Sequence, residues 1–331
     1  MKVLVTGGAG FIGSHLVDEL VDIQDMEVIV IDNLSGGYKE NVNKRAKFVK
    51  TDLRNKKKLD EVMKGVDLIY HLAAYAAEGQ SVFSPIEIND INIDSMNKLL
   101  VSAVNNNVKR VVFTSSMAVY GAQKPPFDER MPKLPVDPYG AAKAYCEDML
   151  EIFWNTYGLE YVVIRPHNVY GPRQNIADPF RNVLGIWINR IMRGKRPIIF
   201  GDGKQERAFS FIDDITTPLA TAGFYNINRE IINLGGWKPY TINEACEKVI
   251  KTMNVDMKPI HVRPRPAEVM RAYCTVDKSI ELLDYREWNT LTEGIEKMSI
   301  WAKNIGPQKP TYTVPLEITK GAPKHWVKRN G

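Results

Sequence analysis

The sequence predicts an α/β fold in which a doubly wound parallel sheet is followed by a smaller C-terminal α/β domain. Short apolar runs alternate with segments of helical period through the first half of the chain, which is typical of βαβ units. A glycine-rich turn joins the first apolar run to the first helical segment. After residue 168 the loops lengthen and Pro and Gly punctuate them, which indicates a second kind of domain.

The apolar runs of the first half have the length of strands. We expect strands at 2–6, 27–32, 47–52, 67–73, 110–116 and 160–166. Helical periodicity predicts helices at about 13–22, 56–64, 89–106 and 138–157. Because the runs are apolar throughout, helices should cover both faces of the sheet. Beyond residue 168 we expect helices at about 181–192 and 242–253, and strands at 197–200 and 231–235.

The change near residue 168 also predicts domain boundaries. We expect residues 1–168 to form the first domain, to which about 209–240 return. Residues 169–208 and 241–306 would form the second, smaller domain. Residues 307–331 make a basic, Pro-rich tail, which we expect to be loose unless Trp326 anchors it to the body.

Composition and charge exclude several classes of protein. The net charge is +5, and most of the excess lies in the tail, so the body lacks the basic face of a nucleic-acid binder. No apolar run approaches the ~20 residues that span a membrane, and the chain begins directly with a strand. The three cysteines show no metal-ligand spacing. We therefore expect a soluble, cytoplasmic protein without a metal.

The turn after the first expected strand contains the spacing Gly7-x-x-Gly10-x-x-Gly13. The first glycine permits a tight turn, the second lets the backbone approach a pyrophosphate, and the third lets the helix pack close to the strand. The helix N-terminus then offers N–H groups and a partial positive charge to the phosphates. Because the motif follows a strand and opens a helix, it predicts a Rossmann-type dinucleotide site.

Asp32 ends the second expected strand, about 20 residues beyond the glycines. A carboxylate here accepts hydrogen bonds from the adenosine ribose hydroxyls and repels a 2′-phosphate. No arginine follows closely, so we expect NAD rather than NADP; the alternative is a turn-forming aspartate. Asp52, at the end of the third expected strand, could reach the adenine amino group or have only a structural role.

Tyr139 and Lys143 lie four residues apart in a helix that Asp137 can cap, so they share one helix face. A neighbouring ammonium, the positive helix end and a cationic nicotinamide would lower the pKa of the phenol. Tyr139 could then remove a proton from a sugar hydroxyl as a hydride leaves the same carbon. Ser116 ends the fifth expected strand, at the sheet edge where such folds place their reaction sites. Each signal alone is common by chance, but their combination in this order is specific.

Together these residues resemble the extended short-chain dehydrogenase/reductase family and, within it, the nucleotide-sugar 4-epimerases typified by UDP-glucose 4-epimerase. The resemblance runs from residue 1 to about residue 300. Besides the glycine turn, it is carried by these segments: Asp32-Asn33, His71-Leu72-Ala73-Ala74, Thr114-Ser115-Ser116, Val119-Tyr120-Gly121, Tyr139-Gly140-x-x-Lys143, Arg165-Pro166-x-Asn168-Val169-Tyr170-Gly171-Pro172-Arg173-Gln174 and Phe200-Gly201-Asp202-Gly203.

The resemblance implies a role for each site residue. Tyr139 would be the acid/base, Ser116 its hydroxyl partner, and Lys143 would bind the nicotinamide ribose. The cofactor-binding residues would be Gly7, Gly10, Phe11, Ile12, Gly13, Asp32, Asn33, Asp52, Leu53, Ala73, Tyr139 and Lys143. Asn168 and Asn182 would hold the sugar nucleotide with Ser116, Arg207 and Arg265 would clamp its pyrophosphate, and Glu268 would bind the nucleoside ribose.

The expected reaction is NAD-dependent epimerisation at C4 of a UDP-sugar through a 4-keto intermediate. UDP-glucose and UDP-galactose are the first candidates, with UDP-N-acetylhexosamines and UDP-hexuronates as alternatives. A sugar-nucleotide 4,6-dehydratase or decarboxylase is less favoured, because Met117 and Ala118 follow Ser116 and neither titrates. A non-catalytic NAD-binding protein is less favoured, because Ser116, Tyr139 and Lys143 are all present.

The resemblance implies two further properties. Tyr273, next to Cys274, is the expected guard of the C2 substituent of the sugar, where its bulk would crowd out an N-acetyl group. A homodimer is expected through helices near 89–106 and 139–157, since both carry more apolar positions than one buried face requires.

Overall fold

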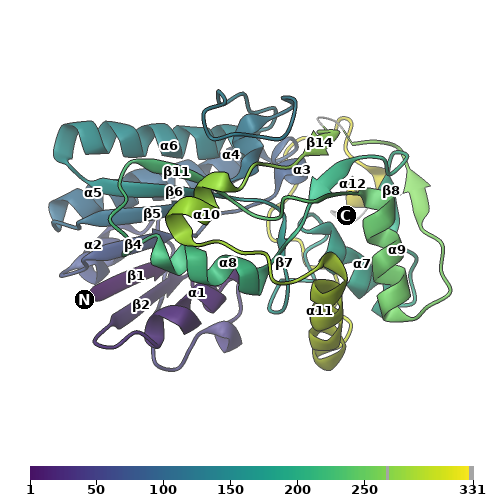
Figure 1. Ribbon diagram of the computed structural model, residues 1–331, viewed down its shortest axis with the longest axis horizontal. Helices are drawn as coiled ribbons and strands as arrows, with labels where there is room; N and C mark the ends of the chain where they lie inside the picture. Colours follow the sequence, from purple (N-terminus) through teal and green to yellow (C-terminus); the bar gives the residue numbers. More distant parts are fainter. Residues whose placement is uncertain (266–267, 328–331) are drawn as a thin grey trace.

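A seven-stranded parallel sheet lies at the centre of the larger part of the molecule (Figure 1). The computed structural model describes residues 1–265 and 268–327. The strand order is β11-β6-β5-β4-β1-β2-β3, and each neighbouring pair runs parallel. The strands are β1 (Lys2–Thr6), β2 (Glu27–Asp32), β3 (Lys47–Lys50), β4 (Leu68–His71), β5 (Arg110–Thr114), β6 (Glu160–Pro166) and β11 (Glu230–Leu234). The expected doubly wound α/β fold is confirmed.

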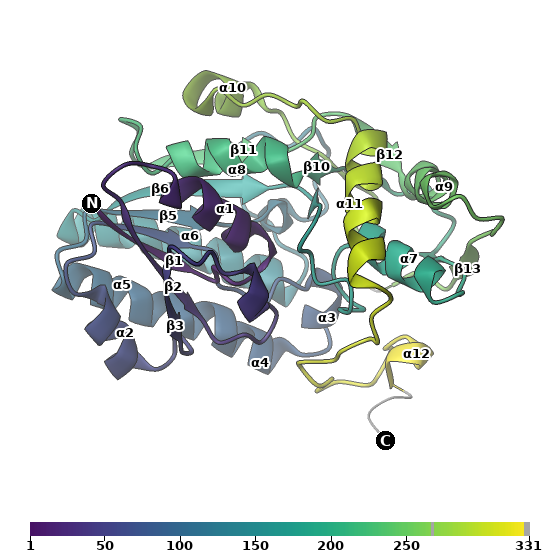
Figure 2. The same ribbon diagram turned by 90° about the horizontal axis from the view of Figure 1, so that it is seen from below.

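Helices cover both faces of this sheet (Figure 2). On one face lie α1 (Phe11–Val21) and α8 (Ile212–Thr221), and on the other lie α2 (Lys56–Met63), α5 (Ser95–Asn105) and α6 (Pro138–Tyr157). In β1, Val3 and Val5 pack in the core beneath α1, whereas Leu4 between them packs in the core beneath α2 and α5. Both faces of the strand are therefore buried, which explains its unbroken apolar sequence.

The other elements form the smaller part of the molecule and the connections. Short helices in the first half are η1 (Lys39–Asn41), α3 (Glu78–Ser81), α4 (Pro85–Asn89), the π-helical η2 (Asp90–Asp94) and η3 (Met117–Tyr120). After β6 follow β7 (Val169–Tyr170), α7 (Val183–Met192), β8 (Ile198–Phe200), β9 (Glu206–Ala208), β10 (Ser210–Phe211), β12 (Pro239–Thr241), α9 (Ile242–Met253), β13 (Ile260–Val262), β14 (Arg271–Ala272), α10 (Asp277–Leu283), α11 (Leu291–Ile305) and α12 (Lys324–Val327).

The structure differs from the expected elements in two ways. The helix expected near 89–106 consists of α4, η2 and α5 in succession. The sequence also did not reveal α8, α10, α11 or the strands β7, β9, β10 and β12 to β14, which have two or three residues each. Strands this short show no period-two pattern, because alternation is recognisable only over about four residues or more.

The pairing of β11 with β6 places residues 230–234 in the central sheet. Between these strands in sequence, α8 packs beside α1 on one face of the sheet (Figure 2). This return of the chain supports the division into 1–168 with about 209–240, and 169–208 with 241–306, which we retain as a proposal.

The tail after residue 306 packs against the body, so the expectation of a loose tail is wrong for residues 307–327. The Glu317 carboxylate accepts hydrogen bonds from the backbone N–H groups of Ile86 (2.9 Å) and Glu87 (2.8 Å) at the start of α4. Trp326 is 3% exposed and meets the rings of Phe83 and Phe180 edge to face. Orphan helix N–H groups and an apolar cluster thus hold the tail; residues 328–331 lie outside the described residues.

Within the described ranges, none of the helices combines the length and the apolar character that a membrane span needs.

Candidate active site

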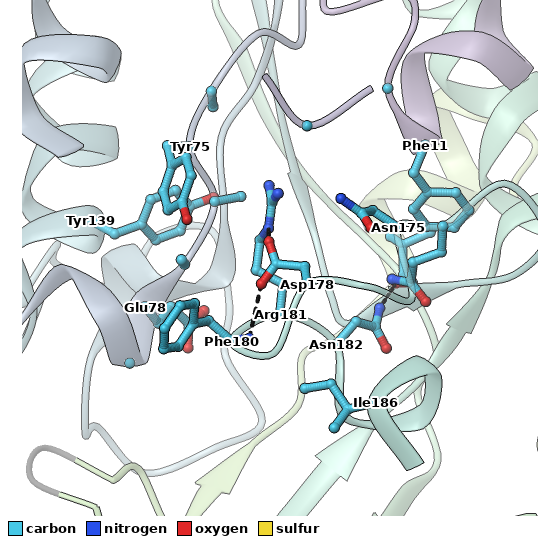
Figure 3. Close-up of a pocket in the computed structure, with 18 of the residues that line it drawn as sticks. Phe11, Tyr75, Glu78, Tyr139, Asn175, Asp178, Phe180, Arg181, Asn182 and Ile186 are labelled. Atoms are coloured by element: carbon cyan, nitrogen blue, oxygen red, sulfur yellow. Dashed lines mark hydrogen bonds and ion pairs between the residues drawn. The ribbon is translucent and has the colours of Figure 1, made fainter. Parts of the chain in front are cut away.

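A cavity of about 790 Å³ opens between the carboxyl edge of the central sheet and the smaller part of the molecule. Its lining includes all the residues that the sequence assigned to catalysis, to cofactor binding or to substrate binding, but not Tyr273, the expected guard of the sugar. Figure 3 shows Tyr139 and Glu78 on one side of this cavity and Phe11 and Asn182 on the other, with Arg181 between them. These predicted residues therefore line one cavity, and we propose their roles below.

The glycine turn forms a cradle at the start of α1. Gly7 has a positive φ of 74°, and a Cβ there would lie 2.8 Å from the Ala73 nitrogen. A Cβ on Gly13 would lie 2.2 Å from the Gly7 carbonyl oxygen, so both positions require glycine. Gly10 is the N-cap and brings no side chain to the first N–H groups of α1. These groups therefore face the cavity as a phosphate site, which fits the pyrophosphate of NAD.

Asp32 is held at the edge of this cradle by backbone hydrogen bonds. Its two carboxylate oxygens accept from the N–H groups of Ala9 (3.0 Å) and Leu34 (2.8 Å). Burial raises the pKa of Asp32, and these two bonds oppose that shift. Each oxygen keeps a further lone pair for a ribose hydroxyl. The turn-stabilising role and the ribose-binding role of Asp32 are therefore compatible.

Asp52 has structural partners in the protein itself. Its carboxylate accepts hydrogen bonds from the Arg54 guanidinium (3.0 and 3.1 Å) and from the Asn33 amide (2.8 Å). The hydrogen bonds from Arg54 lower the pKa of Asp52 to about 2. Asp52 thus has the structural role that the sequence analysis named as one alternative. A contact between Asp52 and adenine would be additional to these hydrogen bonds.

The start of α6 positions the reacting groups. Asp137 accepts a hydrogen bond from the N–H group of Gly140 (2.8 Å) and is followed by Pro138, a residue suited to the first turn. This cap fixes the first turn, in which Tyr139 is 5% exposed. Ser116, which follows β5, accepts a hydrogen bond from the N–H group of Ala118 (3.1 Å). The Ser116 hydroxyl also lowers the pKa of Tyr139 and so favours its phenolate form.

The expected lowering of the Tyr139 pKa is not found in the protein alone. Burial raises the pKa of Tyr139, and the negative charges of Glu78 and Asp137 raise it further. Lys143 is itself 3% exposed, and burial lowers its pKa to about 8. Loss of hydration on burial disfavours the charged form of both side chains. This effect cannot be deduced from the spacing of the two residues in the sequence. The positive charge of oxidised nicotinamide is the contribution that would favour the phenolate.

Two arginines and one glutamate form a charged cluster in the lining of the same cavity. Glu268 accepts two hydrogen bonds from Arg265 (2.8 and 3.0 Å) and lies 3.3 Å from Arg207. The guanidinium of Arg265 stacks 4.9 Å from the Phe200 ring centre. Glu268 thus neutralises part of the positive charge of the two arginines. When a nucleotide binds, one of the hydrogen bonds that Glu268 accepts from an arginine would be replaced by a hydrogen bond from a ribose hydroxyl group.

Asn168 and Asn182 both have a positive backbone φ, and a hydrogen bond orients the side-chain amide of each. Asn168 has φ of 40° and Asn182 has φ of 57°. Their amide groups donate to the carbonyl oxygens of Ala208 (2.8 Å) and Val169. These bonds leave the side-chain oxygen of each amide available to a ligand in the cavity.

Sequence reasoning missed several residues that line the cavity. Glu78 follows β4 at the carboxyl edge of the sheet, the one signal that could have found it. Arg181 forms an ion pair with Asp178 (2.7 Å) and stacks over Tyr75 at 5.0 Å. The tail contributes further lining residues, Pro310, Tyr312 and Trp326.

The structure does not support Tyr273 as the guard of the sugar. Tyr273 is not among the described residues that line the cavity. Its carbonyl oxygen instead accepts a hydrogen bond from the N–H group of Phe127 (2.8 Å), and Cys274 beside it is 2% exposed. The resemblance alone could not determine which side chains near residue 273 face the cavity.

Metal-ligating side chains do not gather in threes or more anywhere in residues 1–265 and 268–327. All three cysteines are free and buried.

Known proteins resemble this chain along nearly its whole length. A sequence model described as the NAD dependent epimerase/dehydratase family matches residues 3–235. A UDP-glucose 4-epimerase of Mycolicibacterium smegmatis is 32% identical over 319 residues, which cover 92% of this chain and 99% of that protein.

Two solved structures share the fold. A UDP-glucose 4-epimerase from Thermotoga maritima with UDP-glucose has a TM-score of 0.88 and 33% identity, over 92% of this chain and 99% of that one. A UDP-N-acetylglucosamine 4-epimerase from Methanobrevibacter ruminantium M1, in complex with UDP-N-acetylmuramic acid, has a TM-score of 0.85 and 36% identity, over 91% and 97%.

Proposed function

Since the chain belongs to the NAD-dependent epimerase/dehydratase family, we propose that it is an isomerase that inverts C4 of a UDP-sugar. UDP-glucose and UDP-galactose are the first candidates for its substrate and product. The observation that carries this proposal is the meeting of Ser116, Tyr139 and Lys143 in the cavity that the glycine turn also lines. This meeting supports an acid/base pair that acts beside a bound dinucleotide.

NAD fits the residues that are present. The glycine cradle and the uncapped start of α1 suit its pyrophosphate. Asp32 suits the adenosine ribose and opposes a 2′-phosphate. When bound, NAD⁺ supplies an acceptor for the hydride of C4 and later a donor for its return.

The residues of this chain would move the proton. Tyr139, as phenolate, takes the proton of the C4 hydroxyl while the hydride leaves C4, so that a C4 ketone forms. Ser116 donates a hydrogen bond to the same oxygen and stabilises the charge that develops there. After the keto sugar turns over, the hydride returns to the opposite face of C4 and Tyr139 gives its proton back.

Lys143 would stabilise the phenolate and orient the nicotinamide ribose. Its ammonium group is anchored on the Thr114 carbonyl oxygen (2.7 Å), so two of its three N–H bonds remain for ligands. Arg207 and Arg265 would hold the pyrophosphate of the UDP-sugar, because guanidinium groups match phosphate oxygens.

The absence of a titrating residue after Ser116 still favours epimerisation over dehydration or decarboxylation. Glu78, however, brings a carboxyl group into the cavity from another strand end. Product analysis must therefore separate a UDP-hexose epimer from a 4-keto-6-deoxy sugar and from a decarboxylated pentose.

We also propose a cytoplasmic homodimer that acts in galactose metabolism. For the dimer, α5 and α6 leave apolar side chains exposed: Val101 is 43% exposed, Tyr145 36% and Ile152 52%. A second copy would cover these side chains. Light scattering at micromolar concentration tests this, and a monomeric mass would contradict it.

The function is tested by incubating purified protein with UDP-glucose, UDP-N-acetylglucosamine and UDP-glucuronate in turn. Bound NAD(H) is measured in the same sample after denaturation. We expect C4 epimerisation without added reductant and cofactor that co-purifies. Inertness towards all three sugars with cofactor bound would contradict the proposal and favour a non-catalytic NAD-binding protein.

A further inference from the structure

The carboxylate of Glu78 differs from the charged groups around it. Its residue is exposed to the cavity, and in the described part of the chain its side chain makes neither a hydrogen bond nor an ion pair. The neighbouring charges are paired: Arg181 with Asp178 (2.7 Å), and Arg207 and Arg265 with Glu268. Glu78 is therefore a negative charge that is free to meet a ligand.

Glu78 lines the same cavity as the residues that would hold the two ends of the sugar. Its charge acts on Tyr139, where C4 reacts, and on Arg207 and Arg265, where the pyrophosphate on C1 would bind. We therefore expect a hexose that connects these ends to lie beside Glu78. Figure 3 shows Glu78 and Tyr139 on the same side of the cavity.

We propose that Glu78 accepts hydrogen bonds from hydroxyl groups of the sugar and excludes sugars that carry a carboxylate. This inference rests on the proposed function and narrows its substrate class to neutral UDP-hexoses. UDP-hexuronates, which the sequence left open as alternatives, would be discriminated against in both binding and turnover.

The balance of charge in the cavity supports this assignment. The pyrophosphate brings two negative charges, and Arg207 and Arg265 already share Glu268. A carboxylate on C6 would add a negative charge opposite Glu78. Arg181 is one cation of the cavity lining, and its charge is already offset by the Asp178 carboxylate, which accepts a hydrogen bond from its Nε (2.7 Å). A hydroxyl group instead satisfies an unpaired carboxylate without a charge conflict.

The titration of Glu78 gives the proposal a second readout. Although Glu78 is accessible from the cavity, the surrounding protein removes part of its hydration, and this raises its pKa to about 7. The negative charges of Asp137 and Glu268 also raise this pKa, whereas Arg207 and Arg265 lower it. Below that pH Glu78 becomes neutral and its repulsion of a sugar carboxylate fades. Affinity for UDP-glucuronate should therefore rise as the pH falls through about 7. Asp137 and Glu268 remain in a Glu78→Gln variant, so loss of this dependence identifies Glu78.

The experiment measures calorimetric binding of UDP-glucose and UDP-glucuronate to the NAD-loaded protein at pH 6, 7 and 8. Wild type, Glu78→Gln and the control Glu87→Gln are compared. Glu87 lies on α4 outside the cavity lining, so its variant removes one negative charge without touching the ligand. At pH 8 we expect wild type and control to favour UDP-glucose by about tenfold or more. Glu78→Gln should shift that ratio about tenfold towards UDP-glucuronate and remove its dependence on pH.

An unchanged ratio in Glu78→Gln would overturn the inference, as would a wild type that binds UDP-glucuronate as tightly as UDP-glucose at pH 8. If the variant fails to fold, the pH dependence of the wild-type ratio decides alone, and a flat ratio overturns the proposal. Failure of the proposed function shows separately, as binding of UDP-glucose without its conversion.

Discussion

The ammonium group of Lys143 donates a hydrogen bond to the carbonyl oxygen of Thr114 over 2.7 Å. This bond joins α6 to the end of β5, two residues before Ser116. One helical turn further on, Glu147 accepts hydrogen bonds from Ser115 (2.6 Å) and from Arg165 of β6 (2.9 and 2.6 Å). Tyr139, Lys143 and Glu147 therefore form one row on α6 that holds the tyrosine beside Ser116.

Replacement of Tyr139 by Phe should remove the proton transfer and little else. The ring volume is kept, so we expect the free energy of unfolding to change by about 1 kcal/mol or less and bound NAD to remain. General acid–base catalysis contributes about 10²- to 10⁴-fold, so kcat for epimerisation should fall at least that far. Ser116→Ala is the comparison and should cost less, because the base remains. Near-full activity of Tyr139→Phe with NAD bound would contradict the mechanism.

Lys143→Met should weaken both cofactor binding and turnover, because the ammonium group serves both. Since burial lowers the pKa of Lys143 to about 8, its positive charge is present below that pH and is lost above it. The NAD affinity of stripped wild type should therefore decrease as the pH rises through about 8. Fluorescence titration of NAD measures this, and the variant should show a weak affinity that does not vary with pH. A wild-type affinity that is constant across this range would contradict the role of Lys143.

NADP should bind far more weakly than NAD. A 2′-phosphate would lie against the Asp32 carboxylate, whose position is fixed by Ala9 and Leu34. Two like charges at about 4 Å repel by roughly 4 kcal/mol at an intermediate dielectric, so at least a 100-fold preference for NAD is expected after relaxation. Titration of stripped protein with each cofactor gives the ratio, and comparable affinities would disprove the assignment.

The sequence predicts those site residues that lie close together in the chain, and it misses those that only the fold brings together. The glycine turn, Asp32, and the pair Tyr139 and Lys143 carry fixed spacings that local backbone geometry requires, and all of them line the cavity. Glu78 is an isolated glutamate at the start of the four-residue helix α3, without a motif spacing or a periodic pattern in the sequence. Its importance comes from the distant residues Tyr139, Arg207 and Arg265 that fold around it.

The tail and Tyr273 show two other limits of the sequence. The tail is held by contacts more than 200 residues apart along the chain, such as the hydrogen bond from the Gln80 amide to the Val314 carbonyl oxygen (2.8 Å). The composition of the tail shows only that it is Pro-rich and basic, and it does not reveal which distant residues the tail contacts. The role expected for Tyr273 was based on an alignment with the family pattern. A shift of one residue along an extended segment turns the side chain to the opposite side, so a small error in the alignment changes the assignment.

Trp326→Ala should raise the KM for the UDP-sugar several-fold and leave kcat and bound NAD little changed. Trp326 lines the cavity with Tyr312 and packs against Phe83 and Phe180, so its loss opens that wall. Trp288→Ala is a matched control, because Trp288 is 73% exposed and does not line the cavity. Steady-state kinetics of both variants test this, and an unchanged KM in Trp326→Ala would show that the tail has no part in substrate binding.

The central claim is that the hydride of C4 leaves the sugar and returns to the same carbon. UDP-glucose labelled with deuterium at C4 is incubated with the protein in ordinary water, and the UDP-galactose formed is analysed by NMR spectroscopy and mass spectrometry. We predict that the label stays at C4 of the product with inverted configuration, because the hydride never exchanges with solvent. Loss of the label to water, or its appearance at another carbon, would contradict the account.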